Sequence, residues 1–133
     1  MTPLEKINAR KIPFANLLGI VIVSAELDRV VARMPVRDDL CTGRSTAHGG
    51  AIMTLADTVG ALATIANLEE SQVTATIESK TNFVGPAPAG ATLIATATPV
   101  HRGRQTQVWT TRIETDGGRL VAVVTQTQIV LDK

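Results

Sequence analysis

The segment from Gly49 to Leu68 constrains the fold more than any other part of the chain. It is rich in Ala, Leu, Ile and Met and has no proline, and its length favours a helix over a strand. Apolar residues fall on nearly every face of this helix. One stripe of them consists of Ile52, Leu55, Val59, Leu62 and Ala66. Because such a helix has to be covered on most sides, we expect it at the centre of the fold.

The rest of the chain is expected to form the strands that pack around this helix. A capping box at Thr2-Pro3-Leu4-Glu5 predicts a short helix over residues 3–10, which Pro13 is expected to end. Runs of β-branched residues and turn signals predict strands at 17–24, 29–36, 72–84, 91–101, 105–115 and 119–131. The fold class is therefore α+β, with one antiparallel sheet of six strands curled around one long helix. At 133 residues, we expect a single domain over residues 1–133.

Composition and charge narrow the range of partners. The net charge is +1 and the aromatic content is 2%, which disfavours nucleic-acid binding. The lone Cys41 excludes an internal disulfide, and His48 and His101 have no zinc-ligand spacing, so no metal and no cofactor is expected. A reducing cytoplasm fits this cysteine usage. Charged residues make up 19% of the chain, below the ~25% of an average domain, which indicates an oligomer.

Asp57 is the only charged residue of the predicted central helix. With Thr54, Asn67 and other polar side chains, it makes this segment costly in lipid, so no membrane role is expected. A carboxylate among apolar residues loses hydration and becomes useful as a base or a nucleophile when it lines a cleft. The alternative is a structural aspartate that bonds to the backbone or to a partner subunit.

The tripeptide His48-Gly49-Gly50 stands at the expected start of the same helix. Unpaired N–H groups at a helix N-terminus stabilise a developing oxyanion, and glycines allow a substrate close to the backbone. Gly49 and Asp57 are eight residues apart, which is about 12 Å along one helix axis. If both act on one carbonyl, the helix N-terminus of one subunit must lie beside Asp57 of another, so the chemistry predicts a homodimer.

The chain resembles the hotdog-fold acyl-CoA thioesterases of the phenylacetic-acid-pathway (PaaI) type. The most specific element of the resemblance is His48-Gly49-Gly50 followed by Leu55-Ala56-Asp57, and further matching segments are Pro13-Phe14, Asn82-Phe83, 86–90, 102–104 and 125–127. The resemblance implies a hotdog fold that dimerises into a larger sheet and often pairs again into a homotetramer. It implies that Asp57 acts as general base or nucleophile, that the Gly49 N–H polarises the thioester carbonyl, and that His48 is a positioning residue.

Further candidate residues for substrate binding are Gly50, Thr42, Asn82 and Gly85. Relatives of this family place an Asn at the position of Thr42 and a Ser or Thr at that of Gly85, and both help to hold the attacking water. Water positioning then falls to backbone groups or to Asn82. We treat Cys41 as a small buried side chain rather than a nucleophile. The small helix residue Gly60 would leave room for a bulky acyl group if it faced the pocket.

Arg102 and Arg104 flank Gly103 at a predicted hairpin, where charges are usually solvated. Because coenzyme A carries phosphates, arginines that project from a turn near a pocket mouth are candidates to bind them. Trp109 on the next strand is expected in the core or at an interface.

The sequence therefore favours an acyl-CoA thioesterase that releases free acid and coenzyme A. One alternative is a hotdog dehydratase acting on a 3-hydroxyacyl thioester, which would need His48 and Asp57 in one site. Another is a non-catalytic acyl-CoA-binding module, which would bind ligand without turnover. The sequence does not identify the acyl group.

Overall fold

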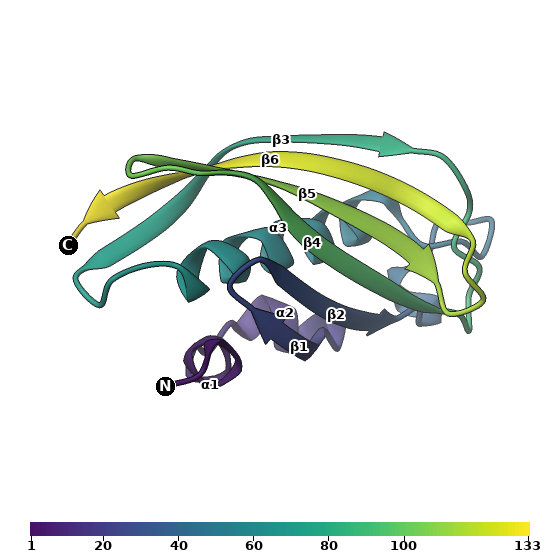
Figure 1. Cartoon of the computed structure of the whole chain (residues 1–133). Coiled ribbons are helices and arrows are strands. Elements are labelled where there is room, and N and C mark those ends of the chain that lie inside the picture. Colours follow the sequence, from purple (N-terminus) through teal and green to yellow (C-terminus); the bar gives the residue numbers. More distant parts are fainter.

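One long helix lies in the concave face of a six-stranded antiparallel sheet (Figure 1), in the computed structural model of residues 1–133. The strands, in their order across the sheet, are β1 (Val21–Glu26), β2 (Arg29–Pro35), β4 (Thr92–Arg102), β5 (Thr106–Thr115), β6 (Leu120–Asp132) and β3 (Gln72–Phe83). The α+β class and the six predicted strands are thereby confirmed, with boundaries that differ by a few residues. The two edges of the sheet are the short β1 and the long β3.

The central helix α3 (Gly49–Ala66) occupies the position expected from its sequence. All five residues of its predicted apolar stripe are buried. By length and composition alone α3 passes for a membrane span, but 56% of it is buried within the fold. It is therefore the core helix of a folded domain, and β3 to β6 arch over it in Figure 1.

Two short helices precede the sheet. The first, α1 (Pro3–Asn8), begins with the predicted capping box, in which Thr2 Oγ1 accepts from the Glu5 N–H at 3.1 Å. The prediction that Pro13 ends a helix and that a strand starts at Leu17 was wrong, because Pro13 begins a second helix, α2 (Pro13–Leu18). Proline is favoured in the first helical turn, and Gly19 ends this helix with φ of 76°, a left-handed conformation that favours glycine.

The edge strand β3 runs alongside α3. A β-bulge interrupts its pairing with β6 between Thr76 and Glu78. Thr76 pairs with Gln128, and Phe83 pairs with Ala122. Large apolar side chains of this edge stand 52–58% exposed, and they are Ile77, Phe83 and Val84. The other side of β3 has no neighbouring strand, so its backbone groups are open to a further strand.

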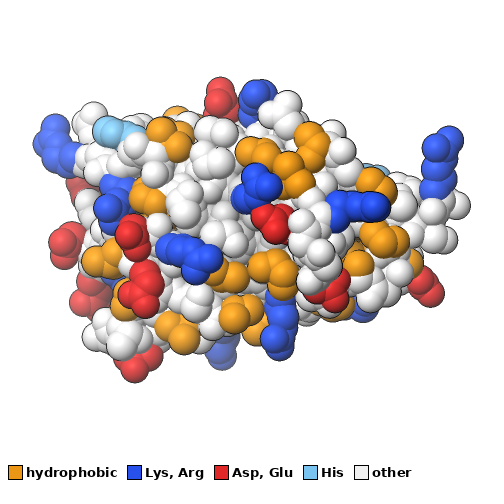
Figure 2. Space-filling view, turned by 45° about the vertical axis from the view of Figure 1, so that its right-hand side comes forward, with side chains coloured by type: hydrophobic (Ala, Val, Ile, Leu, Met, Phe, Trp, Pro, Cys, Tyr) orange, Lys and Arg blue, Asp and Glu red, His pale blue; other side chains and the backbone are white.

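Charges on the surface are mixed in sign. On the face drawn in Figure 2, Lys and Arg side chains alternate with Asp and Glu, and hydrophobic side chains lie between them. Together with the net charge of +1, this face provides no extended positive surface for a polyanion.

Candidate active site

Asp57 lies in the middle of α3 and is half-buried. Its Oδ1 accepts a hydrogen bond from the hydroxyl of Thr76 on β3 at 2.7 Å, and its Oδ2 has no hydrogen-bond partner within the chain. The carboxylate borders a cleft of about 400 Å³, whose other lining residues are Ile12, Phe14, Met53, Thr54, Thr58 and Ser79. Asp57 therefore has one anchored oxygen and a cleft beside it that can admit a reactant.

Ser79 supplies a second hydroxyl to this cleft. Its Oγ is buried and has no hydrogen-bond partner within the chain. Because buried hydroxyl groups are nearly always hydrogen-bonded, an unpartnered one on a cleft wall is suited to a water molecule or a polar substrate group.

The N-terminus of α3 carries the second predicted feature. His48 is the N-cap residue, and its Nδ1 accepts from the Gly50 N–H at 2.8 Å. The N–H groups of Ala51 and Ile52 donate to the His48 carbonyl. The N–H of Gly49 donates to no group within the chain, which leaves it as the free donor of the first turn.

The capping bond also fixes the form of His48. Because Nδ1 accepts a backbone N–H, the neutral imidazole carries its proton on Nε2. The ring of Phe83 packs against Gly49, since a Cβ atom on this glycine would lie 3.2 Å from Phe83 Cζ. Glycine at position 49 thus keeps the free amide accessible beside an aromatic ring.

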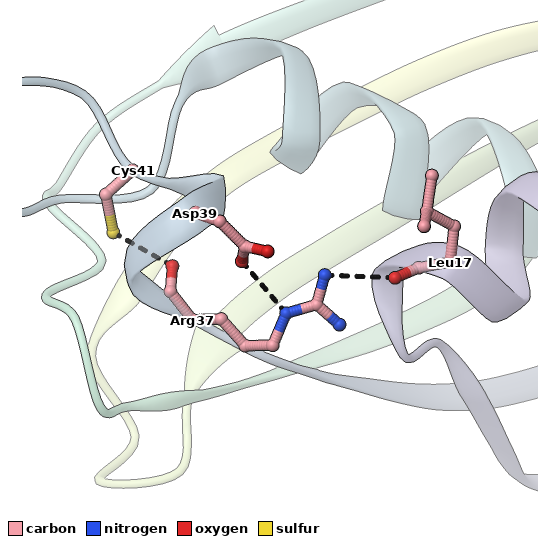
Figure 3. A network of polar contacts seen from close by, with 4 residues as sticks. All are labelled: Leu17, Arg37, Asp39 and Cys41. Carbon is pink, nitrogen blue, oxygen red and sulfur yellow. Dashed lines mark hydrogen bonds and ion pairs between the residues drawn. The ribbon is translucent and has the colours of Figure 1, made fainter.

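His48 and Gly50 border a larger cleft of about 570 Å³. Its apolar wall is formed by Phe14, Leu17, Leu18, Leu40, Cys41 and Ala51. Arg37 braces this wall, because its Nε donates to Asp39 at 3.0 Å and its Nη2 donates to the Leu17 carbonyl at 3.0 Å (Figure 3). The guanidinium thereby ties α2 to the 3-10 helix η1 (Asp38–Leu40).

Cys41 takes part in the same wall. Its Sγ donates to the Arg37 carbonyl at 3.3 Å, and its side chain is half-buried (Figure 3). His48 is the only imidazole that borders this cleft, and its Nδ1 is occupied by the Gly50 N–H. Cys41 is therefore less buried than predicted, and it lies on a cleft wall without a free imidazole nitrogen identified as its partner.

Gly49 and Asp57 remain separate within one chain. They stand on one uninterrupted helix, about 12 Å apart along its axis, and the cleft beside Asp57 does not include His48 or Gly50. One chain alone brings Asp57 together with Thr76 and Ser79, and the free Gly49 amide with His48.

The other predicted substrate-binding residues lie away from Asp57. Thr42 is exposed in a loop, where its hydroxyl accepts from the Arg44 N–H at 3.2 Å. Asn82 falls on the outer face of β3, because the adjacent Phe83 faces α3 and side chains alternate along a strand. At Gly85, a Cβ atom would lie 2.6 Å from the Leu120 carbonyl oxygen, so no larger residue fits without a backbone shift.

The two arginines of the β4–β5 turn differ in their contacts. Nη1 of Arg102 lies 3.3 Å from the Leu27 carbonyl and 3.5 Å from Oδ1 of Asn67, the C-cap of α3. Arg104 is exposed and makes no hydrogen bond within the chain. Both therefore lie near the end of α3 opposite to His48, and only Arg104 has all of its donors free.

Thr76 and Ser79 are site residues that the sequence reasoning missed, and Thr76 is the one that contacts Asp57. It is 19 positions after Asp57 in a strand rich in threonine, and nothing in its local pattern separates it from Thr74 or Thr81. The only available signal was the need of a half-buried carboxylate for a donor on the strand that follows the helix.

Comparison with known proteins identifies the family of this chain. Residues 45–122, which include α3 and the strands β3, β4 and β5, match the thioesterase superfamily. The chain belongs to this superfamily. It is 36% identical to the acyl-coenzyme A thioesterase PaaI of Escherichia coli (strain K12) over 111 residues, which are 82% of this chain and 76% of that protein.

Solved structures agree with this membership. The E. coli PaaI protein of the phenylacetic acid degradation operon superposes with a TM-score of 0.90 at 28% identity, covering 97% of this chain and 93% of that one. A thioesterase of Haemophilus influenzae gives 0.89 at 32% identity, with 97% and 90% covered. A hypothetical thioesterase of Streptococcus pneumoniae, solved with coenzyme A, gives 0.78 at 26% identity, with 86% and 87% covered.

The family match, the PaaI relative and the solved thioesterase structures together confirm the predicted resemblance to PaaI-type thioesterases and the hotdog fold. They also confirm the prediction that the protein is a thioester hydrolase, an acyl-CoA thioesterase. The chain has no group of three or more His, Cys, Asp or Glu side chains that could hold a metal ion.

Proposed function

We propose that this thioesterase hydrolyses an acyl-CoA thioester to the free acid and coenzyme A at a site shared by two copies of the chain. The observation that carries the proposal is the Asp57 carboxylate, which is anchored through Oδ1 and free at Oδ2 beside a cleft. Further support comes from the relative named as an acyl-coenzyme A thioesterase and from the structural neighbour solved with coenzyme A.

Asp57 has the chemistry for either of two routes. As a general base, it takes a proton from water while the water oxygen forms a bond to the thioester carbon, and the C–S bond then breaks with return of the proton to the thiolate. As a nucleophile, its free oxygen forms a bond to the thioester carbon, and the C–S bond breaks to release the coenzyme A thiolate. Water then hydrolyses the resulting anhydride, which restores the Asp57 carboxylate, frees the acid and supplies the proton for the thiolate. In the first route Thr76 holds Oδ1 of Asp57, and Ser79 is placed to orient the water.

The Gly49 N–H would stabilise the negative charge that develops on the thioester oxygen in both routes. It is suited to this role because it donates to no group within the chain, whereas the Gly50 N–H is occupied by His48. His48 then acts as a positioning residue that orders the first turn of α3. The amide belongs to the partner subunit, since about 12 Å separates it from Asp57 in one chain.

A homodimer formed along β3 accounts for this arrangement. The strand is long, its outer edge is unpaired, and it carries exposed Ile77 and Phe83, with exposed Val84 directly after it. Pairing of two such edges would bury apolar surface and bring a second copy next to the strand that holds Thr76. Two dimers then pair into a homotetramer, and the protein acts in the cytoplasm.

The nucleotide of coenzyme A would lie outside the reacting cleft. Arg104 has free donors for a phosphate, and Arg102 stands two residues away with its Nη1 close to two acceptors. The backbone around Gly50 and Gly85, with Thr42, would border the rest of the substrate, whereas Asn82 faces the opposite side of β3. Gly60 does not widen the acyl pocket, because the Gln126 side chain occupies the space beside it.

Two competing functions make different demands. A 3-hydroxyacyl-thioester dehydratase would use His48 and Asp57 jointly as acid and base, yet one ring nitrogen of His48 already caps α3. A non-catalytic binding module would hold acyl-CoA without turnover.

The test is a panel of acyl-CoA substrates with a thiol-detecting reagent, applied to the wild type and to the Asp57→Asn variant. We expect release of coenzyme A by the wild type and a loss of roughly 10²- to 10⁴-fold in kcat for the variant, because the basic oxygen is removed without a change of size. Thermal unfolding checks that the variant is folded. Equal turnover by both proteins would place the chemistry elsewhere, and tight binding without turnover would favour the binding module.

A further inference from the structure

Two glutamines of β6, Gln126 and Gln128, are fully buried under α3. They alternate along the strand, so both side chains face the helix on the inner side of the sheet. A buried amide is costly unless its donors and acceptor are satisfied, which makes the bonds of these two residues informative. Gln126 reaches toward the backbone of Asp57, with its Nε2 3.5 Å from the Asp57 carbonyl oxygen.

Gln128 makes its hydrogen bonds to two threonines of β3. Its Nε2 donates to Thr76 Oγ1 at 2.5 Å, and its Oε1 lies 2.9 Å from Thr74 Oγ1, a hydroxyl that is also 2.8 Å from the Ile129 carbonyl oxygen. Thr76 stands directly opposite Gln128 in the antiparallel ladder, and the β-bulge follows immediately after it. The N–H₂ group of the amide thus points to Thr76, and its oxygen shares the single Thr74 proton with the Ile129 carbonyl.

A threonine hydroxyl has a single proton to donate. Because Thr76 Oγ1 already accepts from Gln128, its own proton is directed to the remaining partner, Oδ1 of Asp57. An ionised carboxylate can only accept, so the whole chain of bonds runs in one direction, from the Gln128 amide through Thr76 to Asp57.

We propose that Gln128 is a positioning residue for hydrolysis, which acts through Thr76 to hold Oδ1 of Asp57 and so leaves Oδ2 directed at the substrate cleft. The inference rests on the proposed role of Asp57. Its physical basis is that a hydroxyl without the Gln128 donor is free to rotate, and a carboxylate without a fixed donor samples orientations that are unproductive for the reaction.

A double-mutant cycle in kcat tests this inference with Thr76→Val, Gln128→Met and the combined variant. Thr76→Val keeps the shape of the side chain and removes the hydroxyl, and Gln128→Met removes the amide while filling a similar volume. We expect each single variant to lose roughly tenfold in kcat with little change in KM, as for loss of one hydrogen bond to a charged group. The combined variant should lose no more than the single ones, because both changes break the same chain of bonds.

Thr111→Val is the matched control for Thr76→Val. Thr111 is also a buried threonine of the sheet, but its hydroxyl has no hydrogen-bond partner within the chain, and it stands opposite Ala97 and Val124 rather than Gln128. This variant should leave kcat unchanged. Thr76→Ser, which retains a hydroxyl, should keep most of the activity.

Losses that multiply in the combined variant, or an unchanged kcat in Gln128→Met, would overturn the inference. NMR of the side-chain amide of Gln128 gives a second readout that needs no activity. Its proton signals should shift in Thr76→Val and in Asp57→Asn but not in Thr111→Val. If the wild type hydrolyses no thioester, the proposed function fails, whereas unshifted amide signals in Thr76→Val contradict the hydrogen-bond chain itself.

Discussion

At the scale of single residues, the Gly49 N–H differs from the neighbouring backbone amides because it has no hydrogen-bond acceptor within the chain. His48 occupies the Gly50 N–H with its side chain and the next two amides with its carbonyl, so only the Gly49 N–H stays free in the first turn of α3. An oxyanion would therefore meet one defined donor at the positive end of the helix dipole.

Gly49→Pro tests this donor, and Gly49→Ala is its control. Proline removes the N–H but suits the first position of a helix, and the φ of −61° and ψ of 138° at His48 suit a residue that precedes proline. Alanine adds the same Cβ next to Phe83 and keeps the N–H. We expect Gly49→Pro to lower kcat by about 10²- to 10³-fold. Steady-state kinetics should show most of the activity in Gly49→Ala, and an equal loss in both variants would point to crowding of Phe83 instead.

At the scale of secondary-structure elements, β3 connects the proposed catalytic carboxylate, Asp57, with the proposed dimer interface. Its inner face gives Thr76 to Asp57 and places Phe83 over Gly49, and its outer edge is unpaired. A change on this edge can therefore alter both assembly and activity.

Replacing Ile77 by lysine places a charge on the exposed apolar edge of β3. We expect Ile77→Lys to weaken the dimer and to lower activity in parallel, because a like charge from each copy would meet at the interface. Light scattering at micromolar concentration measures the mass, and Val100→Lys, at an exposed apolar residue of β4, is the control. A variant that remains fully dimeric would place the interface on another surface.

A helix or strand could be predicted from the sequence where a local residue pattern marks both its type and its ends. The pattern of α3 is unambiguous because apolar residues surround a long segment without proline, and the strands are bounded by clear turns. The start of β1 was misplaced because Leu17 and Leu18 continue an apolar run, whereas Pro13 and Gly19 delimit a helix there.

The candidate site divides in the same way. Asp57 and Gly49 are identifiable because a lone charge and a glycine pair stand out in an otherwise apolar helix. The contribution of Thr76 depends on the register of β3 against β6 and on the bulge after it, and neither is encoded in a local pattern. For the same reason Asn82, which is close in sequence, proves to lie on the opposite face of the strand.

At the scale of the whole molecule, one chain contains each half of the proposed site but does not join them. The cleft beside Asp57 holds the carboxylate with two hydroxyl groups, and the free amide lies about 12 Å along the same helix. Two chains related by a two-fold axis would form two equivalent sites, each with the Asp57 of one copy and the Gly49 amide of the other.

Mixed dimers of Asp57→Asn and Gly49→Pro chains test this sharing most directly. Each variant is expected to be nearly inactive as a homodimer, because every site lacks one of its two groups. With a different affinity tag on each chain, the purified mixed dimer has one site with both groups intact and one with neither. The account predicts about half of the wild-type activity per dimer. Activity no higher than that of the parent variants would contradict a site shared between subunits.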